Sequence, residues 1–295
     1  MSGRDIFLGI IIVVIWGLNF IAIKVGLTDV PPLLLGALRF LAVTFPAIFF
    51  LPRPPIAWRW LISLGLTLNV GQFSLLFLGM KMGMPAGLAS LVLQAQVFFT
   101  LAISVTLLGE RWCWNHALGL ALAAGGMTVI GSQQDTNLVL LGFALTIAAA
   151  ASWGIGNIIM RRATQDVPQL SIVSLVVWAG AVAILPLLLL SWYVEGADAW
   201  KTALQAPTWS TVASVAYLAY LATLGGYVLW GKLLARYPAA IVSPFALLVP
   251  VIGMSSSALL LGEFLSAAQK WGAFLVMTGL VIHLFGERLR LKLGL

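Results

Sequence analysis

The sequence has 295 residues, of which 61% are hydrophobic and only 8% are charged, and its mean hydropathy is +1.06. A soluble domain carries roughly 25% charged residues because its surface faces water, so most of this surface must face lipid. The net charge of +7 comes from basic residues scattered singly and in pairs, which argues against a nucleic-acid-binding face.

Runs of about 20 apolar residues, the length that crosses the hydrocarbon core as a helix, predict ten transmembrane spans. In chain order they cover residues 6–27, 33–51, 60–80, 85–107, 115–131, 138–160, 169–191, 210–234, 239–261 and 268–286. The first run is too long for a signal-peptide core, so we expect it to be retained as a span. The connections are short, and only residues 193–209 are expected to form a long loop. The prediction is an all-α integral membrane protein without a soluble domain.

The positions of Lys and Arg predict the orientation, because cytoplasmic loops are enriched in these residues. With the N-terminus in the cytoplasm, the inner loops and tails receive Arg4, Arg53, Arg59, Arg111, Arg161, Arg162, Arg236, Arg288, Arg290 and Lys292. The outer side receives Lys81 and Lys201, and Lys24 lies near the outer end of the first span. We therefore expect both termini to be cytoplasmic.

An internal repeat relates the two halves of the chain. The segment from Gly83 to Glu110, GMPAGLASLVLQAQVFFTLAISVTLLGE, returns in outline from Tyr237 to Glu263 as YPAAIVSPFALLVPVIGMSSSALLLGE, at an offset of 153 residues. The halves, 1–131 and 138–295, each contain five predicted spans. Because five is odd, the second half starts on the opposite side of the membrane. We expect two inverted five-helix repeats around a central cavity, an arrangement that suits alternating access.

Polar and aromatic residues inside the first and sixth spans are candidate site residues. Trp16 and Asn19 share one helix face, and so do Trp153 and Asn157. A side-chain amide in hydrocarbon is costly unless it is hydrogen-bonded, so both asparagines should point at protein or water. They join helices, line the cavity, or do both.

Further amides lie in the third and fourth spans. Asn69 and Gln72 are three residues apart and share a face, while Gln94 and Gln96 lie roughly 15 Å below Pro85 along the helix, near the midplane. Because Gln94 and Gln96 are only two residues apart, at most one of them should face the cavity.

The ninth span is interrupted at Ser243, next to Pro244, and again at Pro250. A proline lacks an N–H group, so carbonyls such as that of Ala246 become free acceptors. The matching positions of the fourth span, Leu91 and Val97, are not prolines, which predicts a break in the ninth span only. We include Ser243 among the candidate substrate-binding residues.

In the eighth span Tyr220 and Tyr227 lie at helical spacing. Their rings either stack on a ligand or pack against neighbouring helices.

No acid lies near the middle of a span, so a buried proton-carrying carboxylate is not expected. His116 and His283 are far apart in sequence, and we expect no metal pair. Arg39 lies within the second span, where it either snorkels to the membrane surface or attracts a carboxylate; snorkelling or a helix-end partner is the default expectation. We expect Glu110 and Glu263 to cap helix ends. No catalytic residue, cofactor or metal is predicted, because no Ser/His/Asp, di-aspartate or HExxH arrangement occurs.

Taken together, the WGLNF segment from Trp16 to Phe20, the PPLLLGALRF segment from Pro31 to Phe40, and the LLGER ending after the fourth span resemble the EamA family of the drug/metabolite transporter superfamily. The resemblance covers nearly the whole chain. It implies ten helices, a cavity built from spans 1, 3, 4, 6, 8 and 9, and export across the bacterial inner membrane, as in exporters of cysteine/O-acetylserine or aromatic amino acids. Small multidrug pumps of this superfamily carry a glutamate in the first helix, whereas the first span here has none.

The sequence therefore predicts an exporter of neutral amino acids and related small metabolites that works without a proton-carrying carboxylate. The alternative is a proton-coupled multidrug or metabolite efflux pump, and a channel or a membrane-embedded enzyme is a weaker fit. The expected partners are small-molecule substrates and membrane lipid, with no nucleic acid and no obligate protein partner.

The loop charges generate a prediction of topology. Cysteines introduced as Arg162→Cys and Asp198→Cys should react differently with a membrane-impermeant thiol reagent added outside the cell. Position 198 should be labelled and position 162 protected, because the loop charges place them on opposite sides. Labelling of position 162 but not of position 198 would overturn the orientation.

Overall fold

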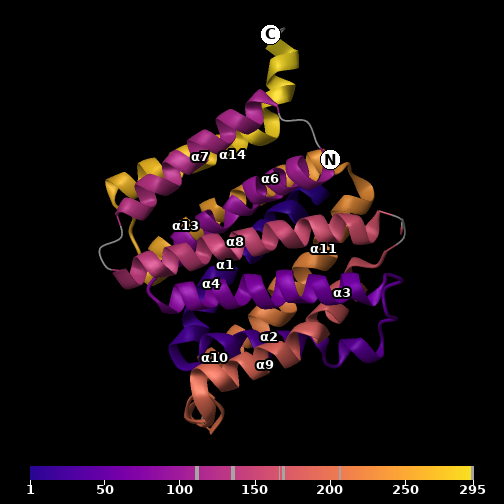
Figure 1. Ribbon diagram of the computed structural model, residues 1–295, viewed down its shortest axis with the longest axis vertical. Coiled ribbons are helices and arrows are strands. Elements are labelled where there is room, and N and C mark those ends of the chain that lie inside the picture. Colours follow the sequence, from indigo (N-terminus) through magenta and orange to yellow (C-terminus); the bar gives the residue numbers. More distant parts are fainter. Residues whose placement is uncertain (110–112, 134–136, 166, 168–169, 206, 294–295) are drawn as a thin grey trace.

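The structure is a computed structural model that describes residues 1–109, 113–133, 137–165, 167, 170–205 and 207–293, and this part of the chain contains helices and no strand. The α-helices are α1 (Gly3–Asp29), α2 (Pro32–Thr44), α3 (Trp58–Leu64), α4 (Gln72–Lys81), α5 (Ala86–Val92), α6 (Gln96–Leu108), α7 (Trp114–Ser132), α8 (Asn137–Thr164), α9 (Ile172–Gln205), α10 (Trp209–Ala216), α11 (Gly226–Arg236), α12 (Ala239–Val242), α13 (Val249–Leu261) and α14 (Ala267–Leu293). Most of them run side by side in one bundle (Figure 1).

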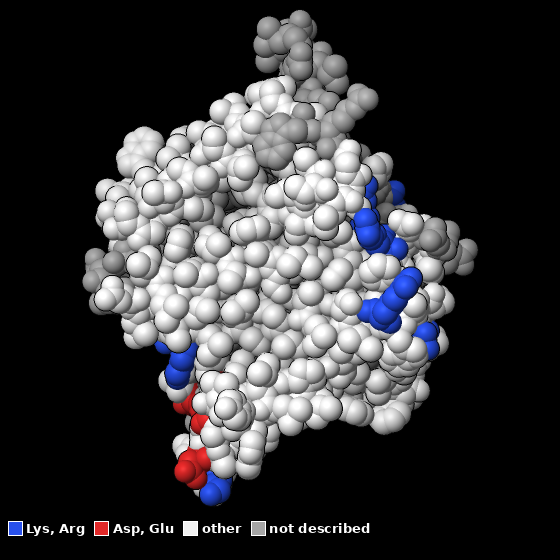
Figure 2. Space-filling view, in the orientation of Figure 1, with Lys and Arg blue, Asp and Glu red and all other residues white. Residues whose placement is uncertain are grey.

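Nine segments of the described chain are long and apolar enough to cross a membrane. They are Gly3–Asp29, Pro32–Phe49, Trp58–Lys81, Ala86–Leu108, Asn137–Thr164, Ile172–Gln205, Trp209–Arg236, Ser243–Leu261 and Ala267–Gly286. The remaining predicted span, 115–131, corresponds to the 19-residue helix α7, which is outside these nine. The all-α membrane fold is confirmed, while the number of ten spans stays a prediction. In Figure 2 the charged side chains gather toward the two ends of the bundle and leave a broad uncharged band between them.

The predicted long loop at 193–209 is largely helical, which corrects the sequence prediction. Helix α9 continues to Gln205 and is broken only at Gly196, whose φ is 83°. Glu195, beside this break, accepts hydrogen bonds from the backbone N–H groups of Leu33 (2.7 Å) and Leu34 (3.1 Å). A carboxylate at a helix N-terminus satisfies donors that have no partner within the helix. Glu195 therefore caps the start of α2 and attaches this part of α9 to it.

Four spans contain irregular turns at matching places in the two halves. π-Helical segments occupy η2 (Gly65–Gly71) in the third span and η4 (Tyr217–Gly225) in the eighth. 3₁₀ segments occupy η3 (Leu93–Ala95) in the fourth span and η5 (Ser243–Leu248) in the ninth. The predicted break in the ninth span is present, but the expectation that the fourth span is unbroken was wrong. The fourth span forms a 3₁₀ turn at Leu93–Ala95 although it has no proline there.

Helices α7 and α14 pack side by side through glycines (Figure 1). A methyl group added to Gly119 would lie 2.7 Å from the carbonyl oxygen of Gly279, and one added to Gly126 would lie 2.5 Å from that of Gly272. The pairing 119 with 279 and 126 with 272 runs in opposite directions along the two helices, so the helices are antiparallel. Small residues permit this close backbone contact between membrane helices.

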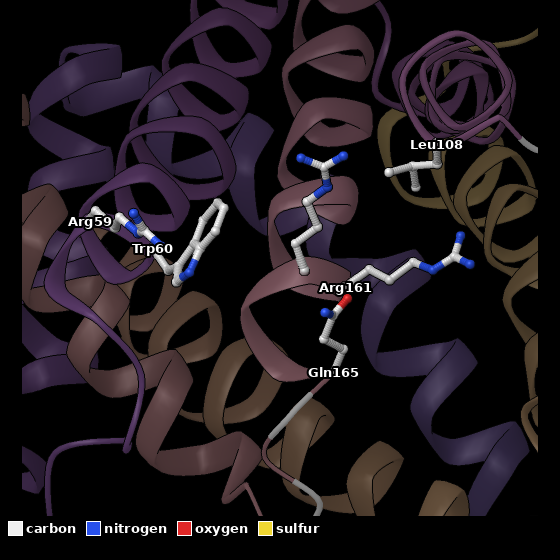
Figure 3. A pocket seen from close by; sticks show the side chains of 6 residues that line it. Arg59, Trp60, Leu108, Arg161 and Gln165 are labelled. Atoms are coloured by element: carbon white, nitrogen blue, oxygen red, sulfur yellow. The ribbon is translucent and has the colours of Figure 1, made fainter.

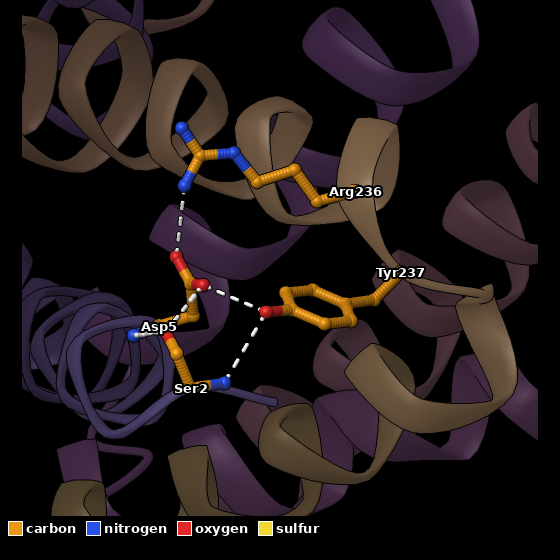
Figure 4. A network of polar contacts seen from close by, with 4 residues as sticks. All are labelled: Ser2, Asp5, Arg236 and Tyr237. Atoms are coloured by element: carbon orange, nitrogen blue, oxygen red, sulfur yellow. Dashed lines mark hydrogen bonds and ion pairs between the residues drawn. The ribbon is translucent and has the colours of Figure 1, made fainter.

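Polar contacts tie the ends of the bundle together. At one end the carboxylate of Asp5, in the first turn of α1, accepts hydrogen bonds from Arg236 (3.0 Å) and the Tyr237 hydroxyl (2.7 Å), as Figure 4 shows. Toward the other end Glu263 accepts from the backbone N–H of Ala86 (2.8 Å) and forms an ion pair with Lys24 (3.4 Å). Glu263 thus caps α5, as the sequence predicted, whereas Glu110 lies outside the described residues.

The glycine contact between α7 and α14 generates a prediction of stability. Gly126→Ala should lower the free energy of unfolding by about 1–3 kcal/mol, because the added methyl group meets the Gly272 backbone. The matched control is Gly125→Ala one position earlier, where a methyl group meets nothing within 4 Å. Thermal unfolding in detergent measures both. Equal melting temperatures for the two variants would contradict the close contact.

Candidate functional site

The breaks in the fourth and ninth spans face each other through Gln94. Its amide Nε2 donates to the carbonyl oxygen of Ala246 at 3.2 Å, and Gln94 is buried. That carbonyl also accepts from the backbone N–H of Val249, while Pro250 has no N–H to offer it. Gln94 therefore joins two broken helices by satisfying an acceptor of the kind that the sequence predicted.

Asn157 and Gln96 meet between the sixth and fourth spans. The Asn157 Nδ2 group donates to Gln96 Oε1 at 2.7 Å and to Thr100 Oγ1 at 3.0 Å. All three side chains are only half-buried. Gln96 Nε2 and Asn157 Oδ1 have no hydrogen-bond partner among the described residues, and neither atom is enclosed. The pair links α8 to α6 and still has one donor and one acceptor to offer.

Asn69 and Gln72 lie at the junction of η2 and α4. Neither side-chain amide makes a hydrogen bond to another described residue, although Gln72 is buried and Asn69 is half-buried. A buried amide without a protein partner is costly, unless water or a ligand completes its hydrogen bonds. These two amides therefore keep donors and acceptors that no described residue uses.

Aromatic rings from α1 and α11 form a cluster beside the π-helical segment η4. The Trp16 ring centroid lies 5.8 Å from that of Tyr227 and 5.2 Å from that of Trp230. The indole N–H of Trp16 donates to the carbonyl oxygen of Ala222 at 3.0 Å. Gly226 permits this approach, since a methyl group there would lie 2.4 Å from Trp16 Nε1.

The remaining predicted site residues make fewer contacts with one another. Asn19 is buried, and its Oδ1 atom has no partner within the described part of the chain. Trp153 packs at the edge of the main hydrophobic core, and Ser243 is half-buried. Tyr220 is 48% exposed and makes no hydrogen bond or ring contact with another described residue. The structure therefore does not bring Tyr220 to the other candidates.

The two ends of the bundle are packed differently. Toward Glu263, α5 contacts α13 and α1, and a methyl group added to Gly87 would lie 3.1 Å from Ser257 Cβ. Away from Glu263, α6 packs on α8, whereas η5 packs on α1 and α14. The fourth and ninth spans thus meet at one end and turn to different neighbours at the other.

A basic pocket of about 570 Å³ opens at this second end, and the sequence reasoning did not identify it. It is lined by Arg59, Trp60, Leu108, Arg161, Arg162 and Gln165, from the ends of α3, α6 and α8 and the turn after α8 (Figure 3). The charge rule for loops gave the side of the membrane for these arginines. The charge rule could not show that residues from three separate helix ends line one pocket.

The default expectation for Arg39 was wrong. Arg39 does not snorkel: it is 4% exposed, and its Nε and Nη2 groups donate to Thr223 Oγ1 at 3.2 Å and 2.8 Å. His116 and His283 are far apart in sequence, and their ring centroids lie 5.0 Å apart because α7 and α14 are antiparallel neighbours. No group of three potential metal ligands occurs among the described residues.

Comparisons with known proteins agree with this architecture. The sequence profile of the EamA-like transporter family matches residues 4–132 and again residues 140–285. Proteins of Salmonella typhimurium and Escherichia coli, each named "probable amino-acid metabolite efflux pump", are 49% and 45% identical to this chain. Each alignment covers 98% of this chain and 98% of the relative.

A solved structure with 18% sequence identity aligns at a TM-score of 0.61, over 96% of this chain and 98% of that chain, which shows a shared fold. The two family matches together span most of the sequence, and the close relatives extend over nearly its whole length. The chain therefore belongs to the EamA-like transporter family and is a transporter rather than an enzyme.

Proposed function

We propose that this transporter exports neutral amino acids and related small metabolites across the bacterial inner membrane, as a facilitator or exchanger. The observation that carries the proposal is that the side-chain amides of Asn69 and Gln72 make no hydrogen bond with another described residue, while the acids with described side chains bond to groups elsewhere. The relatives named as probable amino-acid metabolite efflux pumps support the substrate class.

The chemistry of these groups suits a zwitterion. Amide and backbone oxygens accept hydrogen bonds from an ammonium group, and amide N–H groups donate to a carboxylate. The faces of Trp16 and Tyr227 offer an apolar surface for a side chain. A cation alone would find no carboxylate to neutralise it, and would be costly to bury.

Symmetry within the fold supports alternating access by two inverted repeats, residues 1–131 and 138–295. In the first span Gly17 meets Ile252 of the ninth, and in the sixth span Gly154 meets Phe99 of the fourth. Ile252 and Phe99 are 153 residues apart, which is the offset of the repeat. The antiparallel contact of α7 with α14 fits the same two-fold relation. When two such repeats exchange conformations, a central site that was open to one side of the membrane becomes open to the other side.

In this conformation the Glu263 end is packed and the end with the basic pocket is more open. With the orientation predicted from the loop charges, this basic pocket faces the cytoplasm, which is the side from which an exporter takes its substrate. The ion pair of Lys24 with Glu263 must separate for the outer end to open.

Substitution of an unpartnered amide tests the site. Gln72→Ala should reduce amino-acid transport in proteoliposomes at least about tenfold, because a hydrogen bond to a charged ligand group contributes roughly 1.5–3 kcal/mol. Its melting temperature should stay close to that of the unsubstituted protein, since the Gln72 amide has no described protein partner to lose. Thr106→Ala, at an exposed position of α6, is the control. Parallel losses of stability and transport in Gln72→Ala would show that Gln72 only packs helices.

Coupling is tested with a pH gradient. With no acid placed at the candidate site, an imposed pH gradient at zero substrate gradient should cause no net uptake of labelled amino acid into proteoliposomes. Counterflow driven by unlabelled amino acid inside the vesicles should still occur and serves as the positive control. Uphill accumulation driven by the pH gradient would overturn the facilitator or exchanger proposal and favour a proton-coupled pump.

A further inference from the structure

Arg39 is a positive charge enclosed within the membrane-spanning part of the protein. It lies in α2 with 4% of its surface exposed, and its guanidinium stands over the ring of Phe73, 4.0 Å from the centroid. Its Nε and Nη2 groups share one neutral acceptor, the hydroxyl of Thr223. Its Nη1 group is buried and has no hydrogen-bond partner among the described residues.

None of the acids whose side chains the structure describes forms an ion pair or hydrogen bond with Arg39, and each has another partner. The pairs are Asp5 with Arg236, Asp29 with Thr208, Glu195 with the start of α2, Asp198 with Lys201, and Glu263 with Lys24. An arginine stays protonated in proteins, so the charge cannot be removed by loss of a proton. A buried charge that lacks a counter-ion is strongly unfavourable, and ionisable residues within membrane spans mark functional sites by default.

The guanidinium borders the candidate site on two sides. Phe73, on which it stacks, follows directly after Gln72 in the chain. On the other side Thr223, to which Arg39 donates, directly follows Ala222, whose carbonyl oxygen accepts from the indole N–H of Trp16. The charge therefore acts on the same space as the free amides and the aromatic cluster. At low local dielectric its effect extends over several ångströms.

We propose that Arg39 provides the positive charge of a subsite for the carboxylate group of the transported molecule. This inference rests on the proposed function and adds a requirement to it: the substrate must carry a carboxylate, not merely polar groups. Arg39 is a positioning residue in this scheme, since its Nη1 group is enclosed in the present conformation and the guanidinium acts through its field rather than by direct contact. The same charge disfavours amines that lack a carboxylate, because nothing at this end of the site offsets their repulsion from Arg39.

A purely structural role for Arg39 is the competing explanation. Thr223 Oγ1 donates to the carbonyl oxygen of Leu218 at 2.7 Å, within the π-helical segment η4. Arg39 could serve only to hold Thr223 and thereby η4 in place. The two roles separate experimentally, because Thr223→Val removes both hydrogen bonds of Arg39 but keeps its charge.

The test is counterflow of a labelled neutral L-amino acid in proteoliposomes, competed with the same unlabelled amino acid or with its carboxamide, which keeps the amine but lacks the carboxylate. In the unsubstituted protein the amino acid should compete at least about tenfold better than the carboxamide. In Arg39→Gln this preference should fall to near unity, and Arg39→Lys should restore part of it. Thr223→Val should keep the preference even where its melting temperature falls.

An unchanged preference in Arg39→Gln would overturn the subsite. So would a loss in Thr223→Val as complete as in Arg39→Gln, since this would reduce Arg39 to a support for η4. If Arg39→Gln does not fold, Arg39→Lys and Thr223→Val decide the question. The lysine variant should lose part of the preference for the amino acid over its carboxamide, and the valine variant should lose none. A loss in the valine variant without a loss in the lysine variant would overturn the subsite. Failure of the unsubstituted protein to exchange any neutral amino acid contradicts the proposed function itself. Exchange that does not depend on Arg39 contradicts only the subsite.

Discussion

Backbone groups cannot be left unsatisfied in hydrocarbon, and this constraint explains the central part of the structure. The third, fourth, eighth and ninth spans all leave regular α-helical geometry near their middles. Each break brings backbone carbonyls that need donors from elsewhere. Ser152 donates to the carbonyl of Thr67 in η2 at 2.8 Å, Trp16 to that of Ala222 in η4, and Gln94 to that of Ala246 in η5.

These bonds have a consequence for motion. Because each donor comes from a different span, a change in one broken helix alters the hydrogen bonding of its neighbour. Spans 1 and 8, 3 and 6, and 4 and 9 are coupled in this way. The role of joining helices, one of the two that the sequence suggested for these residues, is seen at both Gln94 and Asn157. Gln94 joins helices with its amide N–H, while Asn157 joins helices and still offers its Oδ1 atom.

The need to satisfy polar groups inside the membrane also explains where the charged residues lie. Acids at the helix ends, such as Glu195 and Glu263, satisfy N-terminal N–H groups of other helices and so fix how the spans enter the bundle. Within the described spans, the charge of Arg39 is enclosed over an aromatic face. A site with free amides and a positive potential differs from one with a buried acid. In the proposed scheme, such a site selects for a ligand carboxylate, and no described acid serves it as a proton carrier.

The sequence by itself determined the membrane class, most span limits and the 153-residue repeat, because these follow from hydropathy and residue identity along the chain. It also located the proline break of the ninth span, since the absence of an N–H group is a property of the residue itself. The break at Leu93–Ala95 has no proline and was missed, because it depends on packing between spans.

Only the tertiary structure decided which partner each polar side chain finds. Arg39 was expected to reach the membrane surface, yet the second span packs so that its guanidinium meets Phe73 and Thr223. His116 and His283 become neighbours because α7 and α14 are antiparallel. Hydropathy reports how deep a residue lies in the membrane, whereas its partner depends on the rotation of each helix about its axis. That rotation is fixed by close contacts such as those of Gly17 and Gly154, which join segments far apart in the chain.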